Sequence, residues 1–177
     1  GENRVQEMVK KLAEHAYDGA PLHFIGHLQR NKVKQVVGQA ALIQSVGSLE
    51  LLEEIEKVAA ARELAQDILL EVNVGREAAK SGFAPEETFA AAEAALGKSQ
   101  VRVRGLMTIP PADADRDTNM RYFEKVRTLY VDINAKLFHN GLEYLSMGMS
   151  GDYADAIRCG ATMVRVGTAI FGARHYL

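Results

Sequence analysis

Three residues near the C-terminus combine side chains and spacing that suit an anionic ligand. Arg165 lies in an apolar run, residues 162–172, that reads as a buried strand entering a loop, and Gly167 and Thr168 follow it. A buried guanidinium needs an acceptor, so we expect a carboxylate or a bound ligand beside Arg165. Gly167 permits close approach of the backbone and Thr168 adds a hydroxyl donor, as phosphate binding requires. The alternative is a core strand in which Arg165 pairs with a structural acid.

The histidines and the single cysteine give weaker signals. His23 and His27 are four residues apart, but Gly26 lies between them at a predicted strand end, where the geometry of a helical metal site does not hold. No acidic cluster joins them, so no metal site is predicted. Cys159 has no partner for an internal disulfide and is expected to be a small buried hydrophobe in a reducing compartment.

Composition favours one globular domain over residues 1–177 with a small-molecule or protein partner. The net charge is −2, with 21 basic and 23 acidic residues and no basic run, so no nucleic-acid partner is expected. The apolar runs are too short to span a bilayer. We therefore expect a cytoplasmic protein that does not bind membranes.

Six apolar segments are predicted to form strands, and helical patterns separate them. The strands are expected at residues 21–26, 42–46, 67–74, 101–109 and 144–148 and at the start of the run 162–172. Helices are expected over residues 3 to about 17, from 31, from 48, from 85 to about 97, across 123–137 and briefly from 150.

Several helix starts carry recognisable signals. Asn3 and Gln6 have the spacing of a capping box, and Pro85 is placed in a first helical turn. Ser48 is a good N-cap for a helix whose apolar face consists of Leu51, Leu52, Ile55, Val58 and Ala59.

Strands that alternate with helices predict a parallel α/β fold, and glycine-containing loops after many strands favour a barrel over an open sheet. A G-x-G-x-x-G fingerprint is absent, which argues against a dinucleotide fold. A complete (β/α)8 barrel of the TIM type has roughly 200 or more residues. With about six strands, the chain is expected to be a barrel that lacks its N-terminal units.

Six motifs, in order, resemble one family. They are Gly1-Glu2-Asn3-Arg4-Val5-Gln6-Glu7, His23-Phe24-Ile25-Gly26 with Leu28-Gln29 and Asn31-Lys32, Lys80-Ser81-Gly82, Gly105-Leu106-Met107-Thr108-Ile109-Pro110, Leu145-Ser146-Met147-Gly148-Met149-Ser150, and the run 162–172. Together they resemble the pyridoxal phosphate homeostasis protein family, whose barrel is of the alanine racemase N-terminal type.

The resemblance implies a single barrel that binds pyridoxal 5′-phosphate (PLP) as an aldimine, without established turnover, and helps to balance cellular PLP and amino-acid pools. Arg165 matches the arginine that meets the pyridine nitrogen. Gly167 and Thr168 match the phosphate cup, which Ser150 joins at the start of its predicted helix. Asn3 matches an asparagine that faces the ring, although its capping role competes.

The same resemblance places the Schiff-base lysine upstream of Gly1, so no catalytic residue is assigned within this chain. Neither Lys32 nor Lys80 matches that lysine. A guanidinium is only a donor, so the ring nitrogen that meets Arg165 should be unprotonated and the ring a weaker electron sink. That arrangement suits a carrier more than an enzyme.

Two other functions stay open. An amino-acid racemase of the same barrel type would need a second, β-rich domain with a tyrosine acid/base, and a phosphate-binding barrel unrelated to PLP would bind no pyridoxal. For a PLP carrier, apo forms of PLP-dependent enzymes are candidate partners, and a monomer is expected.

Overall fold

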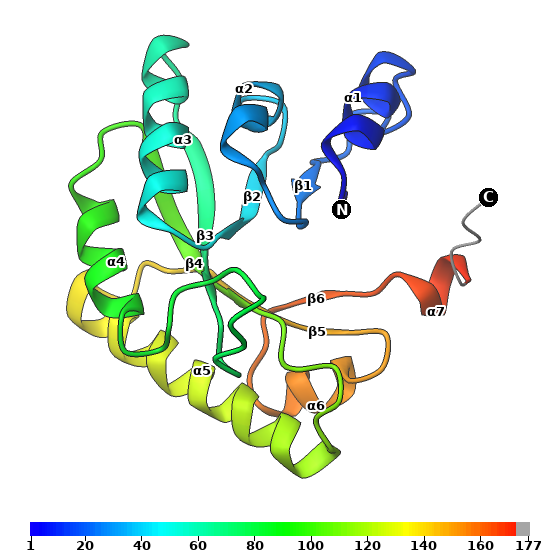
Figure 1. Cartoon of the computed structure of the whole chain (residues 1–177), viewed down its shortest axis with the longest axis vertical. Coiled ribbons are helices and arrows are strands. Elements are labelled where there is room, and N and C mark those ends of the chain that lie inside the picture. The colour runs from blue at the N-terminus through cyan, green and yellow to red at the C-terminus, as the bar shows by residue number, and fades with distance from the viewer. Residues whose placement is uncertain (173–177) are drawn as a thin grey trace.

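A single curled sheet of six parallel strands forms the centre of the molecule. A computed structural model describes residues 1–172. The strands lie side by side in chain order and every neighbouring pair is parallel (Figure 1). They are β1 (His23–Phe24), β2 (Leu42–Val46), β3 (Gln66–Val72), β4 (Val101–Thr108), β5 (Tyr144–Met149) and β6 (Met163–Arg165).

Helices cover the outer, convex side of this sheet (Figure 1). They are α1 (Val5–Ala13), the 3-10 helix η1 (Arg30–Lys32), α2 (Val33–Val36), α3 (Leu49–Ala61), α4 (Thr88–Leu96), α5 (Arg116–Leu137) and α6 (Tyr153–Arg158). A further short helix, α7 (Thr168–Phe171), follows β6 and lies apart from this layer. The predicted barrel architecture with six strands is confirmed as a curled half-barrel.

The two faces of the sheet bury different residues because side chains alternate along a strand. On the convex face, Phe24, Ile43, Leu70, Leu106 and Leu145 pack with the helices in the main core. The concave face carries a second, smaller cluster of Leu42, Leu69 and Met107, with Ile109, Tyr144 and Met163 packed against it.

The longest helices follow local rules. The Ser48 hydroxyl accepts from the Leu51 amide at 3.2 Å, and all five residues of the predicted apolar face of α3 are buried. Asp115, which the sequence analysis did not identify, caps α5 by accepting from the Thr118 amide at 2.8 Å.

The predicted capping box at the N-terminus is wrong. Arg4, not Asn3, is the N-cap of α1, and it makes no side-chain cap hydrogen bond. Residues 1–3 instead run parallel to β1, where Glu2 donates to the His23 carbonyl and accepts from the Ile25 amide, both at 2.9 Å. Pairing with the sheet holds this backbone extended, so the local capping geometry does not form.

Other predicted boundaries also move. The helix α1 ends at Ala13 instead of about residue 17, and α4 begins at Thr88, so Pro85 precedes it. The helix α6 begins at Tyr153 with Asp152 as N-cap, so Ser150 is not at a helix start. The strand β6 is short and only half-buried, whereas a strand covered on both faces was predicted.

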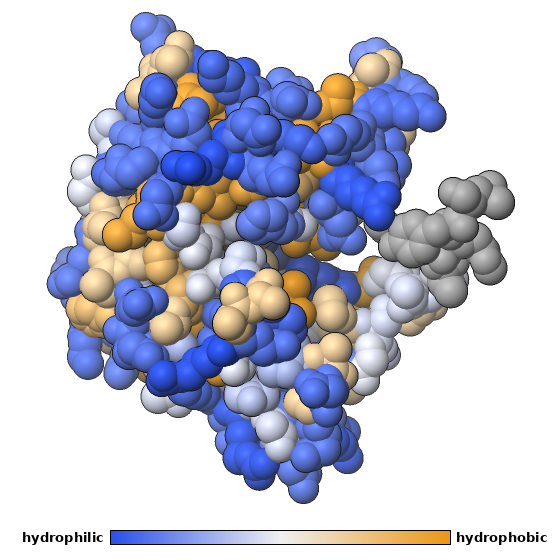
Figure 2. Space-filling model, viewed as in Figure 1, coloured by the Kyte–Doolittle hydropathy of each residue, from blue (hydrophilic) through white to orange (hydrophobic). Residues whose placement is uncertain are grey.

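On the face that Figure 2 shows, hydrophilic residues cover most of the surface. The helix α7 projects from the end of β6, away from the sheet (Figure 1). Its Ile170 and Phe171 side chains are 68% and 85% exposed, so this part of the chain contributes little to the core.

Candidate functional site

Arg165 lies at the C-terminal end of β6 and is held by two neutral acceptors. It donates to the Ser146 hydroxyl at 2.6 Å and to the Thr108 carbonyl at 2.9 Å. Neither acceptor is a carboxylate, so the alternative of a bonded structural acid is not found within residues 1–172, and a ligand as acceptor stays a prediction. Burial lowers the pKa of Arg165 to about 10, although the charges of Glu71 and Asp152 oppose this shift. The guanidinium therefore stays charged at neutral pH.

The two bonds leave part of the guanidinium free. An arginine has five N–H donors, and the contacts within residues 1–172 use two of those of Arg165. Arg165 also lines a cavity of about 580 Å³ at this end of the sheet, together with Lys80, Asn119, Met149 and Asp152. Ligand sites commonly have volumes of about 300–1,000 Å³. The cavity and the free donors suit a ligand that carries an acceptor.

The loop after β6 is joined to Ser150 by main-chain donors. The amides of Gly167 and Ala169 both donate to the Ser150 hydroxyl oxygen, each at 3.2 Å. The hydroxyl hydrogen of Ser150 makes no contact within residues 1–172, so it can be donated to a ligand. Thr168 is exposed beside these groups as the first residue of α7. The two amides thus converge on the Ser150 oxygen, and a phosphate oxygen that binds here would have to replace Ser150 as their acceptor.

Asn3 lies elsewhere on the sheet. It follows the segment that pairs with β1, whereas Arg165 is on β6 at the other end of the strand order. A Cβ atom at Gly26 would lie 2.0 Å from the Asn3 carbonyl oxygen, so Gly26 permits this close approach. Within the described chain, no hydrogen bond joins Asn3 to Arg165, Ser150, Gly167 or Thr168.

The sequence analysis assigned no role to two buried polar residues on the concave face, Gln44 and Ser146. Gln44 and Ser146 are 1% and 0% exposed, and the Ser146 hydroxyl donates to the Gln44 side-chain oxygen at 2.6 Å. The Gln44 amide nitrogen lies 3.0 Å from His23 Nδ1 and donates to Met163 Sδ at 3.2 Å. The sequence did carry a signal for both residues, because each stands two positions after an apolar residue of the concave face and so shares that face.

Glu71 adds a carboxyl group to the same face. It accepts from the Ser81 hydroxyl at 3.0 Å. Burial raises the pKa of Glu71, while the Ser81 bond and the charges of His27 and Arg165 act in the opposite direction. Ser81 belongs to the Lys80-Ser81-Gly82 motif. Gly82 has φ +113°, and a Cβ atom there would lie 2.7 Å from the Asn73 amide, which explains the glycine.

Neither of the two lysines considered as anchors takes part in these hydrogen bonds of the concave face, although Lys80 lines the cavity beside Arg165. Lys32 is in η1 and Lys80 is in an exposed loop. The Lys80 ammonium pairs with Glu77 at 2.5 Å and lies 3.5 Å from the Pro110 carbonyl. Among residues 1–172, no three His, Cys, Asp or Glu side chains are arranged to hold a metal ion. No helix in this range has the length and apolar character needed to cross a membrane.

Sequence comparison extends over nearly the whole chain. Residues 1–175 match the family described as "Alanine racemase, N-terminal domain". A pyridoxal phosphate homeostasis protein of Aquifex aeolicus is 44% identical over 176 residues, which cover 99% of this chain and 77% of the relative. The protein of that name from Escherichia coli K12 is 36% identical over 180 residues, covering 99% of this chain and 76% of the relative.

Solved structures show the same relationship as the sequence comparison. PipY of Synechococcus elongatus, solved without PLP, superposes with a TM-score of 0.90 at 34% identity, covering 97% of this chain and 80% of PipY. PipY with PLP bound gives 0.86 at 33% identity with the same coverage. An alanine racemase of Clostridium difficile gives 0.72 at 20% identity, covering 98% of this chain and 44% of the racemase, which shows a shared fold only.

Proposed function

The chain belongs to the alanine racemase N-terminal domain family, within it to the pyridoxal phosphate homeostasis proteins, and we propose that it binds PLP at the concave end of its sheet. Its role would be the balance of intracellular PLP and amino-acid pools, by binding or carrying PLP, without established turnover. The observation that carries the proposal is Arg165, which is charged, is anchored on two acceptors, has further N–H donors and lines a cavity.

The residues present fit the two polar ends of PLP. We assign Arg165 to the pyridine nitrogen, because a fixed guanidinium can donate to a ring acceptor. Ser150, Gly167 and Thr168 are assigned to the phosphate, because the Gly167 amide meets the Ser150 hydroxyl and the exposed Thr168 follows directly in the chain. Asn3 is assigned to the face of the ring, on the resemblance alone. When bound, PLP supplies an aldehyde that condenses with amines and a ring that withdraws electrons.

Arg165 also supports a carrier over a racemase. A donor-only partner requires an unprotonated ring nitrogen, which weakens the ring as an electron sink. Slow or absent racemisation of alanine by PLP-loaded protein is expected, and rapid racemisation would show that the carrier assignment is wrong.

The proposal extends to location and partners. We place the protein in the cytoplasm as a monomer, with apo forms of PLP-dependent enzymes as acceptors of its PLP. Size-exclusion chromatography with light scattering tests the monomer. Transfer is tested by mixing PLP-loaded protein with an apo-enzyme across a range of concentrations, with free PLP as the control.

The direct test is titration of the chain with PLP, followed by absorbance. We expect saturable, reversible binding, because Lys32 lies in η1 and the Lys80 ammonium is paired with Glu77. Borohydride reduction and peptide mass mapping should then find no adduct at the site. A pyridoxyl adduct on Lys32 or Lys80 that forms at stoichiometric PLP would show that the anchor is misplaced.

A matched pair of serine variants locates the phosphate end. Ser150→Ala should weaken binding of PLP and of inorganic phosphate, because it removes the hydroxyl that collects the Gly167 and Ala169 amides. Ser99→Ala removes a serine hydroxyl that donates to Glu56 and should leave both unchanged. Binding of phosphate but not of pyridoxal would favour the barrel unrelated to PLP.

A further inference from the structure

A series of three hydrogen bonds, buried at its centre and part-buried at its ends, crosses the concave face from β6 to β1. It runs from Arg165 to Ser146, from Ser146 to Gln44 and from Gln44 to His23, over contacts of 2.6, 2.6 and 3.0 Å. Ser146 and Gln44 are 102 residues apart, on strands that are not neighbours in the sheet. This series of hydrogen bonds can therefore form only because the curled sheet brings the two strands together across its concave face.

The direction of every bond in this chain is set at its arginine end. A guanidinium has no acceptor, so the Ser146 oxygen must accept from it. The only hydrogen of that hydroxyl can then go to the Gln44 oxygen. This orients the Gln44 side chain so that its NH₂ group faces Met163 Sδ and His23 Nδ1. His23 Nδ1 must then be an acceptor, which requires an imidazole unprotonated at Nδ1.

Burial makes these hydrogen bonds effective in holding the Arg165 side chain in place. Gln44 and Ser146 are almost fully buried, beside the apolar cluster of Leu42, Leu69 and Met107. Polar groups in such a place depend on one another, because no water competes for their bonds. The other anchor of the guanidinium is the Thr108 carbonyl on β4. Bonds from β4 and β5 thus fix its position and its plane.

We propose that Ser146 and Gln44 are positioning residues that hold Arg165 in the orientation that presents its free donors to the ring nitrogen of PLP. This inference rests on the proposed function and deepens it. Neither residue needs to touch the cofactor. Their contribution is to prevent the guanidinium from turning toward other acceptors, so the donors are already in place when the ring arrives.

The test separates the two ends of the ligand. Three probes are titrated into the chain: PLP, pyridoxal, which lacks the phosphate, and inorganic phosphate, with amide NMR shifts as the readout. Ser146→Ala should weaken PLP and pyridoxal by about tenfold, the scale of a lost hydrogen bond to a charged group, and leave phosphate within about twofold. Gln44→Met, one bond further away, should weaken PLP by roughly threefold.

Two further variants exclude a general structural effect. Ser45→Ala also removes a buried serine hydroxyl with a 2.6 Å bond, from Ser45 to the Gly26 carbonyl, but outside the chain that leads to Arg165. It should leave pyridoxal binding unchanged. Ser146→Thr keeps a hydroxyl and should restore most of the affinity. With ring-labelled PLP, the ¹⁵N shift of the bound ring should change in Ser146→Ala and not in Ser45→Ala.

Three outcomes would overturn the inference. Unchanged PLP and pyridoxal affinity in Ser146→Ala would mean that the Thr108 carbonyl holds Arg165 alone. Equal losses for phosphate and pyridoxal would mean that the hydroxyl supports the fold and not the ring contact. If the parent chain binds PLP no more tightly than phosphate, the proposed function fails first, and this result is distinct from the other two.

Discussion

The two faces of the sheet are built by alternate residues of the same strands, yet they serve different ends. The convex face is mainly apolar, with Phe24, Ile43, Leu70, Leu106 and Leu145 packed under the helices. On the concave face, an apolar residue is followed two positions later by a polar one on four of the strands. The pairs are Leu42 and Gln44, Leu69 and Glu71, Tyr144 and Ser146, and Met163 and Arg165.

This difference shows how stability and binding are separated in one sheet. Large apolar side chains on the convex face exclude water and supply most of the buried area. The polar groups of the concave face lie toward the C-terminal ends of the strands, where parallel barrels place their ligand sites. Changes to the convex face should therefore alter stability, and changes to the concave face should mainly alter binding.

The largest effect should come from the helix layer on the convex side. Phe123, on α5, is fully buried in the main core, so Phe123→Ala should lower the free energy of unfolding by about 3–5 kcal/mol. Phe171→Ala removes the same atoms from a side chain that is 85% exposed and should change it by less than about 0.5 kcal/mol. Urea denaturation measures both, and equal losses would contradict the packing of α5.

Next comes the charged end of the concave face. Arg165→Met should weaken PLP binding by more than about tenfold, because the donors to the ring are lost. The free energy of unfolding should fall by only about 1–2 kcal/mol, because the Ser146 hydroxyl and the Thr108 carbonyl lose a donor. Arg102→Met, which removes an exposed partner of Asp67, is the matched control. A larger loss of stability than of affinity in Arg165→Met would contradict the claim that the concave face serves mainly binding.

A smaller effect should appear in the pH dependence of stability. Burial lowers the pKa of His23 below its ordinary 6.5, so the unfolded chain binds this proton more tightly than the folded one. The free energy of unfolding should therefore fall as pH drops below 6.5, until the pH passes the folded pKa. His23→Asn keeps an acceptor and should reduce this slope. Thermal denaturation between pH 5 and 8, a range that brackets the ordinary histidine pKa of about 6.5, measures this slope. An unchanged slope in His23→Asn would mean that other groups cause the pH dependence.

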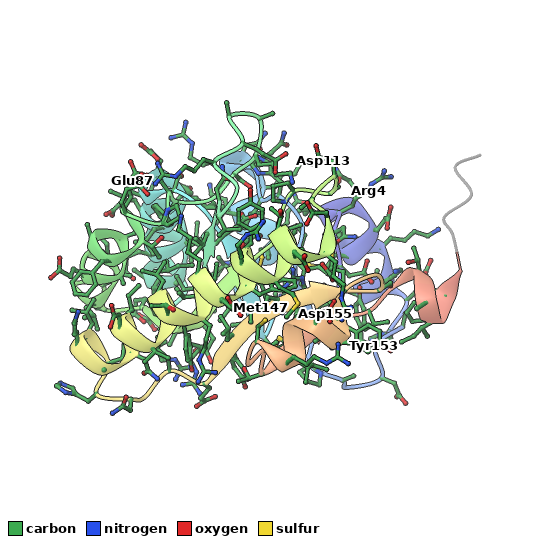
Figure 3. All side chains as sticks on the ribbon, turned by 90° about the horizontal axis from the view of Figure 1, so that it is seen from below. Arg4, Glu87, Asp113, Met147, Tyr153 and Asp155 are labelled. Atoms are coloured by element: carbon green, nitrogen blue, oxygen red, sulfur yellow. The ribbon has the colours of Figure 1, made fainter. Side chains whose placement is uncertain are left out.

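The smallest effect should be at the exposed rim, where α6 lies beside α5. Asp155, labelled in Figure 3, pairs with Arg116 at 2.7 Å and with Arg158 at 2.7 Å. The bond from Arg116, with that from Arg158, lowers the pKa of Asp155 to about 2. Arg116→Ala should raise it part of the way toward 3.8, because Arg158 remains, as an NMR titration would show. No rise would mean that the Arg116 pair does not form in solution.

Features that depend on neighbours in the sequence were predictable. The strand β2 has the predicted bounds, Leu42–Val46, and Ser48 caps α3 as predicted. The alternation of strands and helices predicted the curled parallel sheet. These features were accessible because hydrophobic periodicity and helix caps act over a few residues. For the site, the sequence identified Arg165 and a loop that the structure joins to Ser150, while the roles of the five assigned residues toward PLP stay predictions.

The tertiary structure decided what long-range pairing controls. Asn3 had a plausible local partner in Gln6, but parallel pairing of Glu2 with β1 outcompeted the cap. The acceptors of Arg165 come from residues 19 and 57 positions away, and the bond between Gln44 and Ser146 joins strands that meet only across the concave face. Local patterns fix which residues point inward, but only the curvature of the sheet sets which of them touch. The hydrogen bonds that hold Arg165 are therefore a property of the folded sheet and of no single segment.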